Sequence, residues 1–188
     1  PMDHLRPWSA DRPLLVRHAI LLFGRQNVEK RVTMAENLLI AEGGKEQKYA
    51  LLYKQIASLV EGESDTIANM ANVAAMIHFT FGFWWTGFYR VAGEELVLGP
   101  FQGPLACSRI KYGRGVCGTA WREQQTQVVP DVEQFPGHIA CSSMSRSEIV
   151  VPVWRGEEIM AVLDIDSEHL ATFDEVDKEW LERIVALL

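Results

Sequence analysis

The residues with the clearest chemical potential are three cysteines in the middle of the chain. Cys107, Cys117 and Cys141 all lie between residues 99 and 166. Cys141 follows a Pro-Gly pair and precedes the polar run Ser-Ser-Met-Ser, which is typical of a loop, and exposure favours the reactive thiolate. Cys107 and Cys117 lie in glycine-bearing segments that we expect to be flexible. The group indicates a thiol redox site, although each cysteine taken singly is equally typical of a small core residue.

Three acidic residues beyond the last cysteine are expected to meet. Asp164 and Asp166 are two apart in the apolar run MAVLDIDS, so on a strand they point to the same face. Glu148 opens the preceding strand of the same predicted hairpin and could approach them across the pair. Converging carboxylates repel one another unless they bind a cation or keep a proton. The pattern favours a site that binds an ammonium group or donates a proton, and a solvent-exposed sheet face is the alternative.

An aromatic pair at the start of another predicted strand gives a third chemical feature. Alternation along the strand places Trp85 and Tyr89 on one face, with Gly87 between them. We expect open space above the glycine, so that the two rings form a two-sided slot. Such a slot suits a small apolar group such as a methyl thioether, and ordinary core packing is the alternative.

The spacing of the same residues excludes several other sites. The chain has no CxxC pair, and the cysteine spacings of 10 and 24 residues match no common zinc pattern, so we expect no metal site. Residues 113–118 formally match GxGxxG, but no strand-helix-strand unit frames them, which argues against a dinucleotide site. An odd number of cysteines does not make a secreted disulfide framework and indicates a reducing compartment.

Composition bounds the class of protein. The chain has 188 residues, of which 48% are hydrophobic and 23% charged, as in ordinary globular domains. A formal net charge of −7 argues against a nucleic-acid partner, and no apolar run is long enough to span a membrane. Residues 1–33 hold six basic and three acidic residues, which suits an organelle-targeting segment or a variable helix. We therefore expect an N-terminal extension, 1–33, and a single domain, 34–188.

Helical and strand periodicities predict the elements that position these side chains. Helical spacing predicts two amphipathic helices between residues 45 and 83, with Ser64 or Asp65 as the N-cap of the second. Turn signals bound the strands and hairpins that follow. The remaining predictions are a hairpin over 85–98 that ends at Gly99-Pro100, a short helix after Gly118, a brief strand near 126–129, a hairpin over 147–167, and a final helix from Asp174 or Thr172. Helices at both ends of an antiparallel meander predict an α+β domain.

Four stretches of the sequence carry a family resemblance that runs from about Lys45 to Leu188. They are FWWTGFYRV, LGPFQGPLACSRIKYGRGVCGTA, TQVVPDVEQFPGHIACSSMSRSEIVVPV and VLDIDSEHLATFDEVDKEWLE. Together they closely resemble the free methionine-(R)-sulfoxide reductases, which are single-domain enzymes with the GAF fold. The resemblance implies a six-stranded antiparallel sheet with helices packed on it. It also implies reduction of free methionine-(R)-sulfoxide and not of the protein-bound residue.

The resemblance assigns roles to the three cysteines. Cys141 would attack the sulfoxide sulfur, release methionine and become a sulfenic acid. Cys107 would condense with it to a disulfide, which thioredoxin or a thioredoxin-like protein would reduce by exchange. Cys117 matches the third family cysteine, an alternative resolving thiol, and the sequence leaves open which of the two resolves. No bound cofactor is implied, and the reductant is external.

The resemblance also assigns the substrate contacts and leaves some partners open. Glu148, Asp164 and Asp166 would bind the substrate ammonium and the sulfoxide oxygen, and Trp85 and Tyr89 would hold the S-methyl group. The implied location is the cytoplasm, with organelle targeting by the extension as an alternative, and a homodimer is left open. Two other functions compete with the enzyme: a GAF module that binds a small ligand such as a cyclic nucleotide, and a thiol redox sensor without a substrate.

Overall fold

The computed structural model describes residues 37–138 and 143–188. Most of this part forms one compact unit, Leu38–Leu188. The predicted extension, 1–33, and the candidate nucleophile Cys141 lie outside the described residues. None of the helices in the described ranges is long and apolar enough to cross a membrane.

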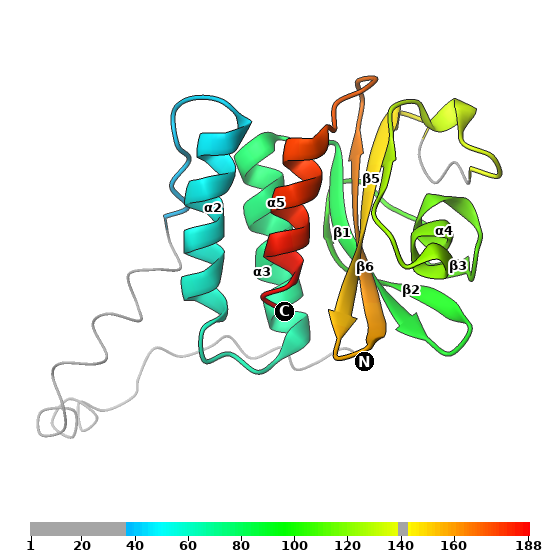
Figure 1. Cartoon of the computed structure of the whole chain (residues 1–188), viewed down its shortest axis with the longest axis horizontal. Helices are drawn as coiled ribbons and strands as arrows, with labels where there is room; N and C mark the ends of the chain where they lie inside the picture. Colours follow the sequence, from blue (N-terminus) through cyan, green and yellow to red (C-terminus); the bar gives the residue numbers. More distant parts are fainter. Residues whose placement is uncertain (1–36, 139–142) are drawn as a thin grey trace, which may run out of the picture. The chain divides into compact units, whose positions relative to one another are not determined.

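A six-stranded antiparallel sheet is the centre of the unit, as predicted (Figure 1). Its strand order is β3-β2-β1-β6-β5-β4, so the hairpin β5–β6 lies beside β1. The strands are β1 Trp85–Ala92, β2 Glu95–Gln102, β3 Arg109–Lys111, β4 Gln127–Val129, β5 Ser147–Arg155 and β6 Glu158–Ser167.

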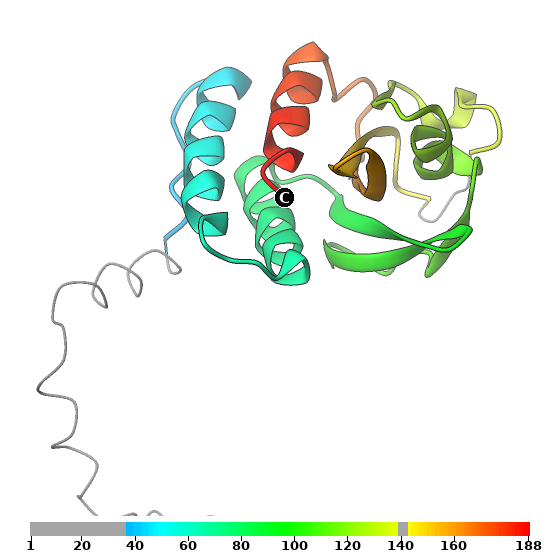
Figure 2. The same cartoon turned by 60° about the horizontal axis from the view of Figure 1, so that its bottom comes forward.

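Helices cover the two faces of the sheet unequally. On one side, α3 Thr66–Phe81 and α5 Glu175–Val185 pack on the sheet, and α2 Lys45–Val60 packs on these two helices. Helix α4 Gly115–Glu123 lies on the other face. Figure 2 separates the three-helix layer from α4 and its neighbouring loops. Successive side chains of β5 and β6 point to opposite faces of the sheet. Ile149 and Leu163 pack in the core on the side of the three helices, whereas Val150 and Val162 pack in the core under α4.

The helix boundaries follow predicted capping residues. Asp65 is the N-cap of α3 and accepts a hydrogen bond from the backbone N–H of Ala68, and Asp174 caps α5 in the same way. Helix α3 ends at Gly82, whose φ of 68° lies in the left-handed region that favours glycine. The side chain of Asp177 is fully buried and accepts a hydrogen bond from the Tyr49 hydroxyl at 2.9 Å, which joins α5 to α2.

Two predicted boundaries on the α4 side are wrong. Strand β2 does not end at Gly99-Pro100 but continues to Gln102. Its register with β1 shifts between Gly87 and Tyr89, so β2 carries an extra residue there, and β3 pairs only with its first part, where Val97 faces Arg109. A bulge and a free edge both tolerate proline, which explains the continuation.

The predicted start of the helix at the GxGxxG-like run is also wrong. Helix α4 begins at Gly115 and not after Gly118. The glycine at 118 is therefore a helical residue, and it is required by close packing: a Cβ there would lie 2.6 Å from the carbonyl oxygen of Lys111. The short strand β3, which precedes this helix, was not predicted.

Candidate active site

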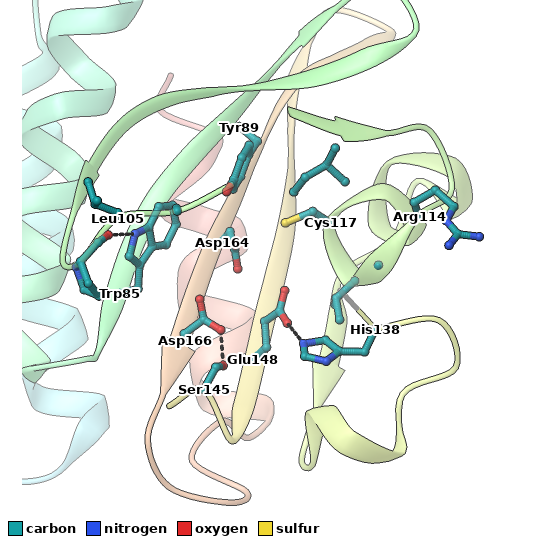
Figure 3. Close-up of a pocket in the computed structure, with 15 residues that line it drawn as sticks. Trp85, Tyr89, Leu105, Arg114, Cys117, His138, Ser145, Glu148, Asp164 and Asp166 are labelled. Atoms are coloured by element: carbon teal, nitrogen blue, oxygen red, sulfur yellow. Dashed lines mark hydrogen bonds and ion pairs between the residues drawn. The ribbon is translucent and has the colours of Figure 1, made fainter. Parts of the chain in front are cut away.

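Six of the predicted site residues line one pocket on the α4 face of the sheet (Figure 3). They come from two strands of the central hairpin, from β1 and from α4. They are Trp85, Tyr89, Cys117, Glu148, Asp164 and Asp166. The fold thus brings together residues up to 81 positions apart in the sequence.

Strand register places the three acids next to one another. Glu148 on β5 pairs directly with Asp166 on β6, and antiparallel partners point to the same face. Asp164 is two residues before Asp166 and therefore shares that face. Asp166 accepts a hydrogen bond from the hydroxyl of Ser145, whereas Oδ1 of Asp164 is buried without a hydrogen-bond partner in the described part of the chain. The expected convergence of the acids is present, and their face of the sheet is not solvent-exposed.

Burial makes these carboxyl groups unusually weak acids. Burial raises the pKa of Glu148 well above its usual range, and the nearby charge of Asp164 adds to this shift. Burial, with the charge of Asp166, also raises the pKa of Asp164. Burial raises the pKa of Asp166 to about 6, and the hydrogen bond from Ser145 opposes that rise. A pocket of this kind can retain a proton near neutral pH and donate it to a bound oxygen.

The two aromatic rings form one wall beside the acids and not the open slot expected across Gly87. The centroids of Trp85 and Tyr89 are 5.9 Å apart and the rings are stacked at 26°. A Cβ on Gly87 would lie 2.5 Å from the indole ring and 2.4 Å from Cβ of Phe101, so the space above the glycine is filled. The glycine lets the indole fold over the strand. The Trp85 indole N–H donates to the carbonyl of Pro104 at 3.1 Å, which fixes the ring (Figure 3).

Cys117 occupies a buried position, contrary to the flexible segment expected for it. It lies in the first turn of α4 and is a free cysteine with 3% of its surface exposed. Burial raises the pKa of its thiol well above the usual range, and the charges of Asp164 and Glu148 act in the same direction. A thiol in this environment stays protonated and is a poor nucleophile.

Cys107 lies outside the pocket lining, on the connection between β2 and β3. It is disulfide-bonded, and its backbone carbonyl accepts a hydrogen bond of 3.0 Å from the Tyr89 hydroxyl. The neighbouring residues 104–106 line the pocket. This hydrogen bond therefore links Tyr89 of the aromatic wall to the Cys107 backbone.

The pocket also contains residues that we had not predicted to be there. Ser145, Leu105 and Arg114 line it, and the Leu105 side chain is 90% exposed at its edge. His138 also lines the pocket and points its Nε2 toward Glu148 Oε2 at 4.0 Å (Figure 3), and burial lowers its pKa. The polar run before β5 was the available signal for Ser145, but only the register of the hairpin shows which acid it contacts.

Comparisons with known proteins match the same region. The family model of the GAF domain matches residues 61–188. GAF domain-containing protein A of Dictyostelium discoideum is 56% identical over 156 residues, which cover 82% of this chain and 99% of that protein. Free methionine-R-sulfoxide reductase of Escherichia coli is 44% identical over 145 residues, or 77% of this chain and 88% of that enzyme.

A solved structure extends the match to three dimensions. Free methionine-R-sulfoxide reductase from Neisseria meningitidis, in complex with its substrate, is 51% identical and superimposes with a TM-score of 0.79. The match covers 80% of this chain and 92% of that chain.

Proposed function

The chain belongs to the free methionine-(R)-sulfoxide reductase family of GAF-domain proteins, and we propose that it reduces free methionine-(R)-sulfoxide to methionine. The observation that carries this proposal is the buried group of Glu148, Asp164 and Asp166 beside the Trp85–Tyr89 wall. This arrangement offers a contact to each distinctive part of the substrate. It suits a compound that combines an ammonium group, a polar sulfoxide oxygen and an S-methyl group.

The acids account for both recognition and activation. An ionised carboxylate stabilises the substrate ammonium, which a residue inside a peptide chain lacks because its nitrogen is part of an amide. A carboxyl group that stays protonated donates to the sulfoxide oxygen, and the raised pKa values of the group support this role. Protonation matters because a sulfoxide sulfur is a weak electrophile until its oxygen is hydrogen-bonded. The indole of Trp85 and the ring of Tyr89 give the S-methyl group an apolar contact.

The proposed chemistry uses two cysteines. The Cys141 thiolate attacks the sulfoxide sulfur, the protonated oxygen is transferred to Cys141 as a sulfenic acid, and methionine leaves. Cys107 then attacks the sulfenic sulfur, which releases water and forms a disulfide. A thioredoxin-like dithiol reduces that disulfide by exchange. The disulfide bonding of Cys107, beside the free and buried thiol of Cys117, supports Cys107 as the resolving residue.

The same pocket argues against a cyclic-nucleotide module. A phosphate would meet three acids in a buried site, where like charges interact strongly. We place the proposed enzyme in the cytoplasm, because a thioredoxin-like reductant requires a reducing compartment. The sequence leaves a homodimer open, and light scattering of the purified protein would test it.

A substrate panel tests the activity. NADPH consumption would be followed with thioredoxin and thioredoxin reductase, offering free methionine-(R)-sulfoxide, the free (S) epimer and a peptide-bound sulfoxide in parallel. We expect turnover with the free (R) compound alone. Equal rates with the peptide would contradict the ammonium-binding role of the acids, and folded, reduced protein inactive on all three would contradict the enzyme.

A matched pair of serine variants tests the cysteine roles. Cys107→Ser should release about one methionine per chain in a single turnover and then stop, because no thiol resolves the sulfenic acid. Cys117→Ser should continue multiple turnover with the same reductant. Rapid quench and steady-state assays on both variants separate the two steps. Loss of recycling in Cys117→Ser, with recycling kept in Cys107→Ser, would exchange the two assignments.

A further inference from the structure

A thiol and two carboxyl groups face one another at the base of the pocket. One donor atom each of Cys117, Glu148 and Asp164 can be chosen so that all three lie within 4.8 Å of one another. The three residues are 3%, 6% and 6% exposed. They come from α4, β5 and β6, so only the folded chain assembles them (Figure 3).

Two features of this group bear on what else it could bind. The sulfur of Cys117 faces two acids, and the proposed reaction assigns no step to it. Oδ1 of Asp164 is buried and has no hydrogen-bond partner within the described ranges. Buried acidic groups are costly unless they are paired with a cation or coordinate a metal. Both features indicate a ligand that is positively charged and accepts sulfur as well as oxygen.

We propose that Cys117, Glu148 and Asp164 bind a thiophilic divalent cation of the Zn²⁺ class, in competition with the amino-acid ligand of the pocket. Zinc takes thiolate at about 2.3 Å and carboxylate at about 2.0–2.2 Å. Tetrahedral ligand atoms at these lengths lie roughly 3.5 Å apart. From separations of up to 4.8 Å, each pair of donor atoms therefore needs to approach by at most about 1.3 Å. The thiol proton, and any proton held by the carboxyl pair, leaves to solvent, and no electron is transferred.

The donor set selects the kind of metal. Mg²⁺ and Ca²⁺ require six or more oxygen ligands, whereas one thiolate with two carboxylates suits Zn²⁺, Co²⁺ or Cd²⁺. The same carboxylates would meet the ammonium of a bound amino acid, so metal and amino acid exclude each other. The metal is thus an inhibitor or a protective occupant of the site and not a resident cofactor. The site rests on the geometry of the pocket, and only the competition rests on the proposed function.

Cobalt provides the direct test because a cobalt–thiolate bond has a charge-transfer absorption. In the full-length Cys107→Ser/Cys141→Ser variant, Cys117 is the sole remaining thiol. We expect one Co²⁺ per chain, a thiolate charge-transfer band, and displacement of both by Zn²⁺. Adding Cys117→Ser should abolish the band, and adding Asp164→Asn should weaken binding at least tenfold. Glu133→Gln, at an exposed carboxylate outside the pocket, is the matched control and should bind normally.

Circular dichroism of each variant verifies that it is folded before titration. Absence of the band at stoichiometric Co²⁺ in the folded single-thiol variant would overturn the site, as would unchanged affinity in Asp164→Asn. A second arm adds free methionine, which should raise the apparent dissociation constant of Co²⁺ in proportion to its concentration. Cobalt binding that is insensitive to methionine would overturn the competition. Cobalt binding in a protein inactive on every sulfoxide would overturn the reductase proposal and leave the metal site standing.

Discussion

At the scale of single residues, the pocket depends on acids whose ordinary chemistry is changed by burial. Glu148 and Asp164 lie among apolar strands and near each other, which disfavours the charged form of both. Asp166 is the most moderate of the three: burial raises its pKa to about 6, the hydrogen bond from Ser145 opposes that rise, and no neighbouring charge adds to it as it does for Glu148 and Asp164. Because the pKa values of these three neighbouring carboxyl groups differ, a single site can hold a negative charge and a transferable proton together.

The raised pKa of Asp166 has a measurable effect on stability. Between its ordinary value of 3.8 and its folded value of about 6, the folded chain keeps a proton that the unfolded chain has released. The free energy of unfolding contributed by this group therefore falls as the pH rises through that window. The difference of roughly two pH units corresponds to about 3 kcal/mol.

Asp166→Asn removes this ionisation and tests it. From pH 4 to pH 7, the free energy of unfolding of the variant should rise relative to wild type by about 3 kcal/mol. Urea denaturation at several pH values measures the difference, with the exposed Glu133→Gln as control. A difference that does not change with pH would show that Asp166 titrates normally in the folded protein.

At the scale of elements, the register of the β1, β6 and β5 strands builds the site. Trp85 pairs with Asp166, and Asp166 pairs with Glu148, so one row across three strands carries an aromatic ring and two acids. A slip of one residue in either pairing would turn one side of this row to the opposite face. The register shift of β2 near Gly87 then brings Phe101 against the indole.

Gly87 is a position at which any side chain would disturb this arrangement. Gly87→Ala would place Cβ against the Trp85 ring and Phe101, and relief of that overlap should cost about 1–3 kcal/mol of stability. Displacement of the indole should also raise KM for the sulfoxide. Thermal unfolding and steady-state kinetics measure the two effects. Gly44→Ala, whose Cβ would meet only the flexible Gln47 side chain at 3.4 Å, should cost less than about 1 kcal/mol.

At the scale of the whole molecule, the sheet separates the main apolar core from the face that holds the pocket. The α3 and α5 helices cover one face, and α2 packs on them so that all three share one continuous apolar core. The opposite face holds the pocket together with α4 and the connecting loops. The described residues that line the pocket all lie from Trp85 to Asp166, and the compact unit is Leu38–Leu188.

This organisation predicts the result of truncation. A chain that begins at Leu38 should keep kcat and KM for the sulfoxide within about twofold of the full chain, because it retains every described residue that lines the pocket. Parallel kinetics and thermal unfolding of both proteins measure this. A large loss of activity with unchanged unfolding would assign a direct role in the reaction to residues before Leu38.

The sequence by itself determined the family and most of the helices and strands. Apolar periodicity and capping by Asp65 and Asp174 depend on local interactions, so the helices α2, α3 and α5 and the β5–β6 hairpin were predicted correctly. The quoted motifs predicted the reductase family and the six-stranded fold, and both are confirmed. The separation of two residues between Asp164 and Asp166 fixed their common face, because the strand period is two.

Only the tertiary structure decided what surrounds those residues. The filled space over Gly87 depends on Phe101 from a neighbouring strand, and the continuation of β2 past Pro100 depends on a bulge and a free edge. The burial of Cys117 against Glu148 and Asp164 depends on the packing of α4 over the sheet. Such contacts join distant segments and follow no local periodicity, so spacing along the chain could not predict them.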